Sequence, residues 1–384
     1  MNTVSAPAAV TAADLGSRLR AARAVLAEHA AATEKQGRPT RESLTAAEEV
    51  GAFAVTTPRE FGGLGADHRT MVRMFAELGA GCASTAWICV ISAMQKRYVF
   101  DGMTPGARQA VYSDPNVQVC GSGRPAGRSE TVDGGFVISG RWEYMSGCLD
   151  AGWALLAVGE LDGKPPGRPS VALVPVASLQ IERTWDGVVG LRGTGSHALV
   201  AERIFVEDDF LINAALPGNG PFPPHHMLAA VLHSVSPLFG ATRGALDLMA
   251  EFMTAERPVA MSPYTQRSQS PSARSLFVET SELVDTAELR MMRIADVFDA
   301  AESGDPLSEQ EIARARMQLV TALHECRHAL ETMLDLSGSS ALIGANPINR
   351  AWRDVAMGSR HIGLLPSVTV DHLTSTLFPG PGPI

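Results

Sequence analysis

The feature that most constrains the fold is Gly135–His197, a stretch of short apolar runs punctuated by glycine and proline. Trp153–Val158 and Val171–Val176 are such runs, and their length and flanking residues favour buried β-strands. The sequence on either side carries the spacing of long helices. The chain is therefore predicted to be an α+β protein, with a small β module held between two helical blocks.

Apolar residues at helical spacing predict the elements outside this module. The predicted helices cover residues 11–34, 41–53, 69–78, 84–98 and 105–112 before the module, and 225–256, 274–302, 308–336 and 347–363 after it. A hairpin is expected at residues 132–136, where Asp-Gly follows an apolar residue. A Pro- and Gly-rich linker at residues 216–224 completes a predicted division into a helical domain (1–115), a β domain (116–220) and a helical bundle (221–384).

Composition excludes several classes of function. The net charge of -9 over 384 residues argues against a nucleic-acid partner, and no apolar run is long enough for a membrane span. The five cysteines form no Cys-x-x-Cys pair, which predicts buried free thiols, no zinc site and a cytoplasmic location. These cysteines are Cys82, Cys89, Cys120, Cys148 and Cys326.

Three local motifs occur in an informative order. Gly140–Cys148 carries an aromatic residue followed two positions later by serine, Gly190–Ser196 is a Gly-rich turn, and Asn346–Asp354 begins with a helix cap. Together with the order helices, β module, helices, they resemble the acyl-CoA dehydrogenase family. That resemblance implies an N-terminal helical domain, a central β-barrel or sandwich and a C-terminal helical bundle.

Other motifs resemble the branch of two-component flavin monooxygenases, such as p-hydroxyphenylacetate hydroxylase oxygenase components. They are Thr57–Leu64, Ser84–Trp87, Leu191–Ser196 and Ser359–His361. The dehydrogenases' catalytic carboxylate has no counterpart, since Leu364–Val370 contains no glutamate. The resemblance implies reduced FMN or FAD and O2 as co-substrate, with oxygen transfer through a C4a-hydroperoxide. It also implies a separate NAD(P)H:flavin reductase, a small-molecule substrate that is hydroxylated or N-oxygenated, and a homotetramer.

The same resemblance assigns roles near the flavin ring. Ser146 is expected to hydrogen-bond the flavin near N5 and C4a, and Tyr144 to pack beside the ring. His361 is expected to exchange a proton with substrate or peroxide, which suits a group that titrates near neutrality. The alternatives are a strand serine bonded to backbone, a core aromatic residue and a capping or surface histidine.

Phosphate binding is expected from the Gly-rich turn, through Arg192, Thr194 and Ser196. Gly121-Ser122-Gly123 matches another flavin-contacting loop, so Ser122 is a cofactor candidate; a plain turn is the alternative. Arg257 and Ser339 are expected to reach the flavin phosphates of a neighbouring subunit.

Substrate contacts are expected at Trp87 and Gln95. Gln95 lies in the stretch where several members of the branch carry a substrate-contacting histidine, and this departure leaves natural-product substrates open. His324 and His328 share a helical face without a third ligand, so a helix surface is favoured over a metal site. Two rival functions remain: an acyl-CoA dehydrogenase-like FAD desaturase with its base elsewhere, such as a glutamate on the 225–256 helix, and a flavin-free interaction protein.

Overall fold

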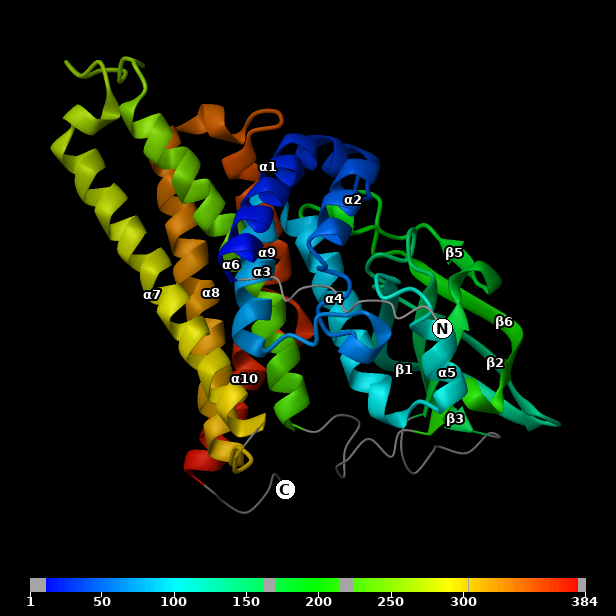
Figure 1. Cartoon of the computed structure of the whole chain (residues 1–384). Helices are drawn as coiled ribbons and strands as arrows, with labels where there is room; N and C mark the ends of the chain where they lie inside the picture. The colour runs from blue at the N-terminus through cyan, green and yellow to red at the C-terminus, as the bar shows by residue number, and fades with distance from the viewer. Residues whose placement is uncertain (1–11, 162–169, 214–223, 303, 379–384) are drawn as a thin grey trace.

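The computed structural model describes residues 12–161, 170–213, 224–302 and 304–378 (Figure 1). Nearly all of the predicted linker at residues 216–224 lies outside the described residues. In Figure 1 the long C-terminal helices form a bundle at the left and the sheet lies at the right, with α4 between them.

The helices before the sheet agree with the apolar spacing of the sequence. Thr40, Asp67 and Thr104 cap three of them by accepting a backbone N–H in the first turn. The second helix ends at Glu49, earlier than predicted, because the chain turns at Gly51 with a φ of 74°. The helices are α1 (Ala12–Gln36), α2 (Arg41–Glu49), α3 (His68–Gly81), α4 (Ala83–Val99) and α5 (Pro105–Val111).

The described strands form one mixed sheet in the order β5-β6-β2-β1-β3-β4-β7. Only β1 and β3 run parallel; the other neighbours are antiparallel. The predicted hairpin joins β1 to β2, with Val132 opposite Gly135. The strands are β1 (Val119–Val132), β2 (Gly135–Trp142), β3 (Trp153–Leu161), β4 (Ser170–Pro175), β5 (Gln180–Glu182), β6 (Ala198–Glu207) and β7 (Leu211–Asn213).

The C-terminal helices form the bundle that was predicted, with one addition. Helix α9 ends at Gly358 and not at residue 363, and a further helix, α10, follows from Pro366. Pro366 in the first helical turn is the signal that could have found it. The helices are α6 (Pro224–Thr254), α7 (Pro271–Glu302), α8 (Glu309–Ser337), α9 (Pro347–Gly358) and α10 (Pro366–Leu377).

Two further expectations can be compared with the described residues. All five cysteines are buried free thiols, as predicted. Among the described helices, none combines the length and the apolar character that a bilayer span needs.

Helices α3 and α6 approach so closely that glycine is needed at the contact. A Cβ atom added at Gly240 would lie 2.0 Å from the carbonyl oxygen of Ala76, and one added at Gly79 would lie 2.4 Å from that of Pro237. Val72 and Ala76 of α3 accordingly belong to the same apolar core as the C-terminal bundle. The two helical blocks therefore pack into one body and fix the orientation of α4.

Gly240→Ala is expected to lower the free energy of unfolding by about 1–3 kcal/mol, because the helices must separate to admit the methyl group. Gly16→Ala in α1 is the matched control, since its Cβ would meet only the Arg20 side chain at 3.7 Å. That change should raise stability by about 0.5–1 kcal/mol through helix propensity. Urea denaturation of both variants measures the change in the free energy of unfolding, which should be negative for Gly240→Ala and positive for Gly16→Ala. Equal changes in the two variants would contradict the close packing of α3 and α6.

Candidate functional site

The loop after β2 and the turn before β6 are joined by backbone hydrogen bonds. Met145 N donates to His197 O at 3.0 Å, and Gly147 N donates to Thr194 O at 2.8 Å. These bonds connect positions about fifty residues apart in sequence and hold both segments in one arrangement. The predicted site residues of the two motifs are thereby brought together.

A chain of hydroxyl groups runs through this junction. Ser146 Oγ lies 2.7 Å from Ser196 Oγ, which lies 2.7 Å from Thr194 Oγ1. Thr194 Oγ1 in turn donates to Leu191 O at 2.8 Å. All three hydroxyl residues are buried. The alternative of a serine bonded only to nearby backbone is therefore wrong for Ser146.

Tyr144 stands at the edge of this junction and faces solvent. Its side chain is 63% exposed, its φ is 61°, and its ring meets Trp185 edge to face with centroids 6.0 Å apart. A left-handed backbone is uncommon for an aromatic residue and is found where surrounding structure imposes it. Tyr144 is therefore not a core residue, and a flat aromatic surface is displayed beside the hydroxyl chain.

Helix α9 holds in place the turn that contains Thr194 and Ser196, two members of the hydroxyl chain. Leu191 N donates to Asp354 Oδ1 at 2.6 Å, and Arg353 donates to Val189 O at 2.9 Å. A Cβ atom at Gly190 would lie 2.0 Å from Arg353 O, so only glycine fits there. Burial raises the pKa of Asp354 to about 6 by penalising its charged form. The sequence motif contained Arg353 and Asp354, yet their clamping role was missed because nothing local reveals it.

Helix α4 lines the sheet side of the site. A Cβ atom added at Gly147 would lie 2.9 Å from Ile88, and one added at Gly121 would lie 2.7 Å from the Gln95 side chain. Gln95 therefore packs against Gly121, the neighbour of Ser122 in the chain. The plain turn considered for Ser122 is wrong: the residue lies inside β1, where the register with β3 shifts just after it.

Trp87 and His361 meet on another face of α4. Their rings pack edge to face with centroids 5.7 Å apart, and His361 Nδ1 accepts from Gly363 N at 3.3 Å. Protein atoms crowd the ring and lower the pKa of His361, although the residue still reaches solvent. His361 thus caps the turn and also lies beside Trp87, a predicted substrate residue.

The residues expected at a neighbouring flavin lie elsewhere. Arg257 stacks on Phe252 at 5.6 Å, and Arg267 stacks on the same ring at 4.2 Å while donating to Leu336 O at 2.8 Å. Arg257 and Ser339 are exposed, the first just after the end of α6 and the second just after the end of α8.

A flavin fits the residues at this junction. His197 is buried, its Nδ1 accepts from Thr184 N and Trp185 N, both at 3.1 Å, and its Nε2 has no partner. A neutral ring in this state offers Nε2–H as a donor. Arg192 is exposed in the adjacent turn and offers a cation. An unpaired donor, a cation, a buried hydroxyl and an exposed aromatic ring suit a polar, flat, anionic cofactor.

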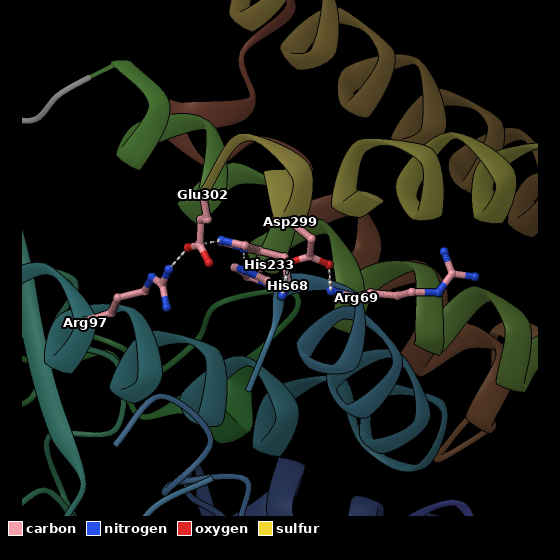
Figure 2. Close-up of polar contacts among 6 residues, drawn as sticks. All are labelled: His68, Arg69, Arg97, His233, Asp299 and Glu302. Carbon is pink, nitrogen blue, oxygen red and sulfur yellow. Dashed lines mark hydrogen bonds and ion pairs between the residues drawn. The ribbon is translucent and has the colours of Figure 1, made fainter. Parts of the chain in front are cut away.

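A second polar cluster joins α3, α6 and α7 (Figure 2). His68 Nε2 lies 3.0 Å from Glu302 Oε1, and His68 Nδ1 lies 2.9 Å from His233 Nε2. Ligand atoms of His68, Asp299 and Glu302 lie within 4.8 Å of one another, close enough for a metal ion. Asp299, however, accepts two backbone N–H groups at the start of α3, and Arg97 pairs with Glu302. The cluster therefore links helices.

His324 and His328 lie exposed on α8, as predicted.

Comparison with known proteins identifies the family. Residues 18–103 match the acyl-CoA dehydrogenase N-terminal domain, and residues 232–366 match its C-terminal domain. The FADH(2)-dependent resorcinol hydroxylase oxygenase component of Rhizobium sp. is 30% identical, with 86% of each chain covered. The flavin-dependent monooxygenase oxygenase subunit HsaA of Rhodococcus jostii is 29% identical, with 90% of this chain and 93% of the relative covered.

Solved structures agree with these sequence matches. XiaF from Streptomyces sp., in complex with FADH2 and glycerol, is 27% identical with a TM-score of 0.87, and the match covers 97% of this chain and 96% of XiaF. The predicted fold is confirmed, and the chain belongs to the acyl-CoA dehydrogenase family, in the branch formed by the oxygenase components of flavin-dependent monooxygenases.

Proposed function

We propose that this protein uses reduced flavin and O2 to hydroxylate or N-oxygenate a small aromatic or natural-product substrate. The observation that carries the proposal is the buried hydroxyl chain ending at Ser146 beside exposed Tyr144. Consecutive residues of α4, Trp87 and Ile88, connect this junction to His361. One short segment of helix thus lies between the proposed flavin contact and the proposed proton donor.

Each residue has a distinct proposed task. The bound reduced flavin supplies the electrons that activate O2 for oxygen transfer. Ser146, Tyr144 and Arg192 hold the cofactor, with Ser122 beside them on β1. Because Nδ1 of His361 accepts from Gly363, the hydrogen of the neutral ring is on Nε2. His361 therefore presents Nε2–H as a hydrogen-bond donor, and it transfers this proton when the ring is protonated.

The substrate is proposed to lie between Trp87 and Gln95. Relatives act on resorcinol and on indole-3-acetate, according to their names. Gln95 offers both an amide donor and an acceptor where a histidine could offer a base. A substrate that already carries its own acidic or nucleophilic group, such as an electron-rich phenol or an aromatic amine, suits this pair.

The proposed assembly needs other chains. The oxygenase-component relatives imply a separate flavin reductase, for which we propose an NAD(P)H:flavin reductase. We also propose a cytoplasmic homotetramer, in which Arg257 and Ser339 of one subunit approach the flavin of another. Both residues are exposed after the ends of α6 and α8 and take no part in the hydroxyl chain of their own subunit, which supports this exchange.

The desaturase alternative needs a carboxylate base elsewhere in the chain, such as a glutamate on the 225–256 helix. The glutamates of that segment are Glu251 and Glu256, and both are exposed, the first in the last turn of α6 and the second just after it. Neither belongs to the buried hydroxyl chain at Ser146. The oxygenase assignment is therefore the better supported one.

The direct test mixes the protein anaerobically with reduced FMN or reduced FAD, then adds O2 with a panel of phenols and aromatic amines. Micromolar binding and oxygenated product containing 18O from 18O2 are expected. Reduction of bound flavin by an acyl thioester would instead establish a desaturase, and absence of any flavin binding would leave an interaction protein.

His361→Ala is expected to leave reduced-flavin affinity unchanged and to lower the product formed per O2 consumed by about 10²-fold, the lower range for a lost general acid. Oxygen electrode and product assays measure this ratio. His328→Ala, on the exposed face of α8, is the matched control and should behave as wild type. Wild-type coupling in His361→Ala would remove His361 from the reaction.

A further inference from the structure

The direction of the hydroxyl chain fixes what Ser146 can offer to a ligand. A carbonyl oxygen only accepts, so the single hydroxyl hydrogen of Thr194 is committed to Leu191 O at 2.8 Å. Thr194 Oγ1 must then accept the hydrogen of Ser196 across 2.7 Å. Since that hydrogen is used, Ser196 Oγ must accept from Ser146, also across 2.7 Å. The hydrogen of Ser146 therefore points inward.

We propose that Thr194 and Ser196 are positioning residues that make Ser146 an obligatory hydrogen-bond acceptor and thereby select reduced over oxidised flavin. Reduced flavin carries a hydrogen on N5 and can donate it, whereas N5 of oxidised flavin has only a lone pair. An acceptor at Ser146 matches the first form and repels the second. This inference rests on the proposed flavin contact of Ser146.

The surrounding contacts hold the chain in this direction. Leu191 O also receives Thr194 N at 3.1 Å and Trp185 Nε1 at 3.0 Å, and Leu191 itself is fixed at a φ of 50°. Reversing the chain would break the bond from Thr194 and leave two oxygens 2.8 Å apart with no hydrogen between them. The loss of one such buried bond corresponds to about tenfold in affinity.

Selection of this kind suits an enzyme that receives flavin from another protein. After turnover the flavin is oxidised, and an acceptor at Ser146 promotes its release. The next reduced molecule then binds in preference to the oxidised one. The hydroxyl chain would thus set the direction of flavin exchange, without adding a group that touches the substrate.

The test compares affinities for reduced and oxidised FMN, measured anaerobically by fluorescence titration, in wild type and Thr194→Val. Valine keeps the shape but frees the hydrogen of Ser196 to turn toward Ser146, whose own hydrogen can then face the ligand. The ratio of the oxidised to the reduced dissociation constant is expected to fall about tenfold. The two-electron potential of the bound flavin should fall by about 30 mV, the equivalent of that ratio.

Thr194→Ser retains the hydroxyl and is expected to keep the wild-type ratio. Ser196→Ala interrupts the hydroxyl chain at another point and should change the ratio in the same direction as Thr194→Val. It provides the test if Thr194→Val does not fold. A ratio within twofold of wild type in folded Thr194→Val and Ser196→Ala overturns the inference, and the proposed function then still stands. Failure of the wild-type protein to bind either flavin at micromolar concentration overturns both.

Discussion

Replacement of Lys96 by alanine is expected to lower the free energy of unfolding by about 3–5 kcal/mol. Lys96 is 1% exposed, and its ammonium donates to Phe53 O, to Thr57 Oγ1 at 3.1 Å and to Pro115 O at 3.1 Å. The variant removes this donor from Phe53 O and Thr57 Oγ1, whereas Pro115 O keeps the bond from Thr57 Oγ1 at 3.0 Å, and it creates a cavity where the side chain lay. The joint between the first helices and the start of the sheet would loosen.

Urea denaturation of Lys96→Ala measures the loss, and Lys35→Ala is the matched control. Lys35 is exposed in the last turn of α1, so its removal should change stability by less than about 0.5 kcal/mol. Equal effects of the two substitutions would show that the buried contacts of Lys96 contribute nothing.

The same side chain also makes stability depend on alkaline pH. Burial lowers the pKa of Lys96 to about 7, whereas the unfolded value is about 10.4. Between these values the unfolded chain binds more protons, so the stability of the wild-type protein should rise with pH over this range. Lys96→Met, which keeps the apolar stem, should remove this rise.

Acidification from pH 7 to pH 5 is expected to destabilise the folded protein by up to about 4 kcal/mol through His68 and His233. Both imidazoles are buried and stacked with centroids 5.1 Å apart (Figure 2). Burial, with a smaller contribution from Arg97, lowers the pKa of His68 to about 4, and burial with the neighbouring His68 holds the pKa of His233 well below its usual value. Unfolded histidines titrate near about 6.5.

The sign follows from these pKa values. Below about pH 6.5 the unfolded chain takes up protons that the folded protein excludes, so stability falls as pH decreases toward the folded pKa. Each histidine contributes up to about 1.4 kcal/mol per pH unit in this window. The nearby carboxylates, Glu302 and Asp299, are held by Arg97 and by the start of α3, which limits their pull on the imidazoles.

His233→Leu is expected to remove about half of this acid sensitivity, measured as the free energy of unfolding at pH 7 and pH 5. His328→Gln is the control because His328 is exposed on α8. The acid-induced loss of stability must be compared between variant and wild type, because Asp354 also titrates between pH 7 and pH 5. Its raised pKa makes its own contribution to stability increase on acidification, opposite to that of the histidines. An unchanged slope in His233→Leu would show that the buried pair excludes no protons.

Much of the fold was predictable because its signals are local. The apolar spacing of α3 and α4, the Thr104-Pro105 cap of α5 and the turn between β1 and β2 depend on residues a few positions apart. The motifs around Ser146 and His361 also identified the family and the candidate site. Their matches involve short runs of sequence, which a single chain displays fully.

Other features depend on contacts between distant residues. The bond from Leu191 N to Asp354 joins residues 163 positions apart, and the His68–His233 contact joins residues 165 apart. No local pattern marks either partner. The Gln95 side chain likewise packs against β1 only because Gly121 has no Cβ atom in the way.

The sequence by itself thus determined the order of helices and strands, the family and the residue types available at the site. Only the tertiary structure decided that Thr194 and Ser196 turn toward Ser146, that α9 fixes Leu191 and that His361 packs on Trp87. The physical reason is that helix and strand formation follows from near neighbours, whereas the direction of a hydrogen bond is set by whichever distant group supplies the last acceptor.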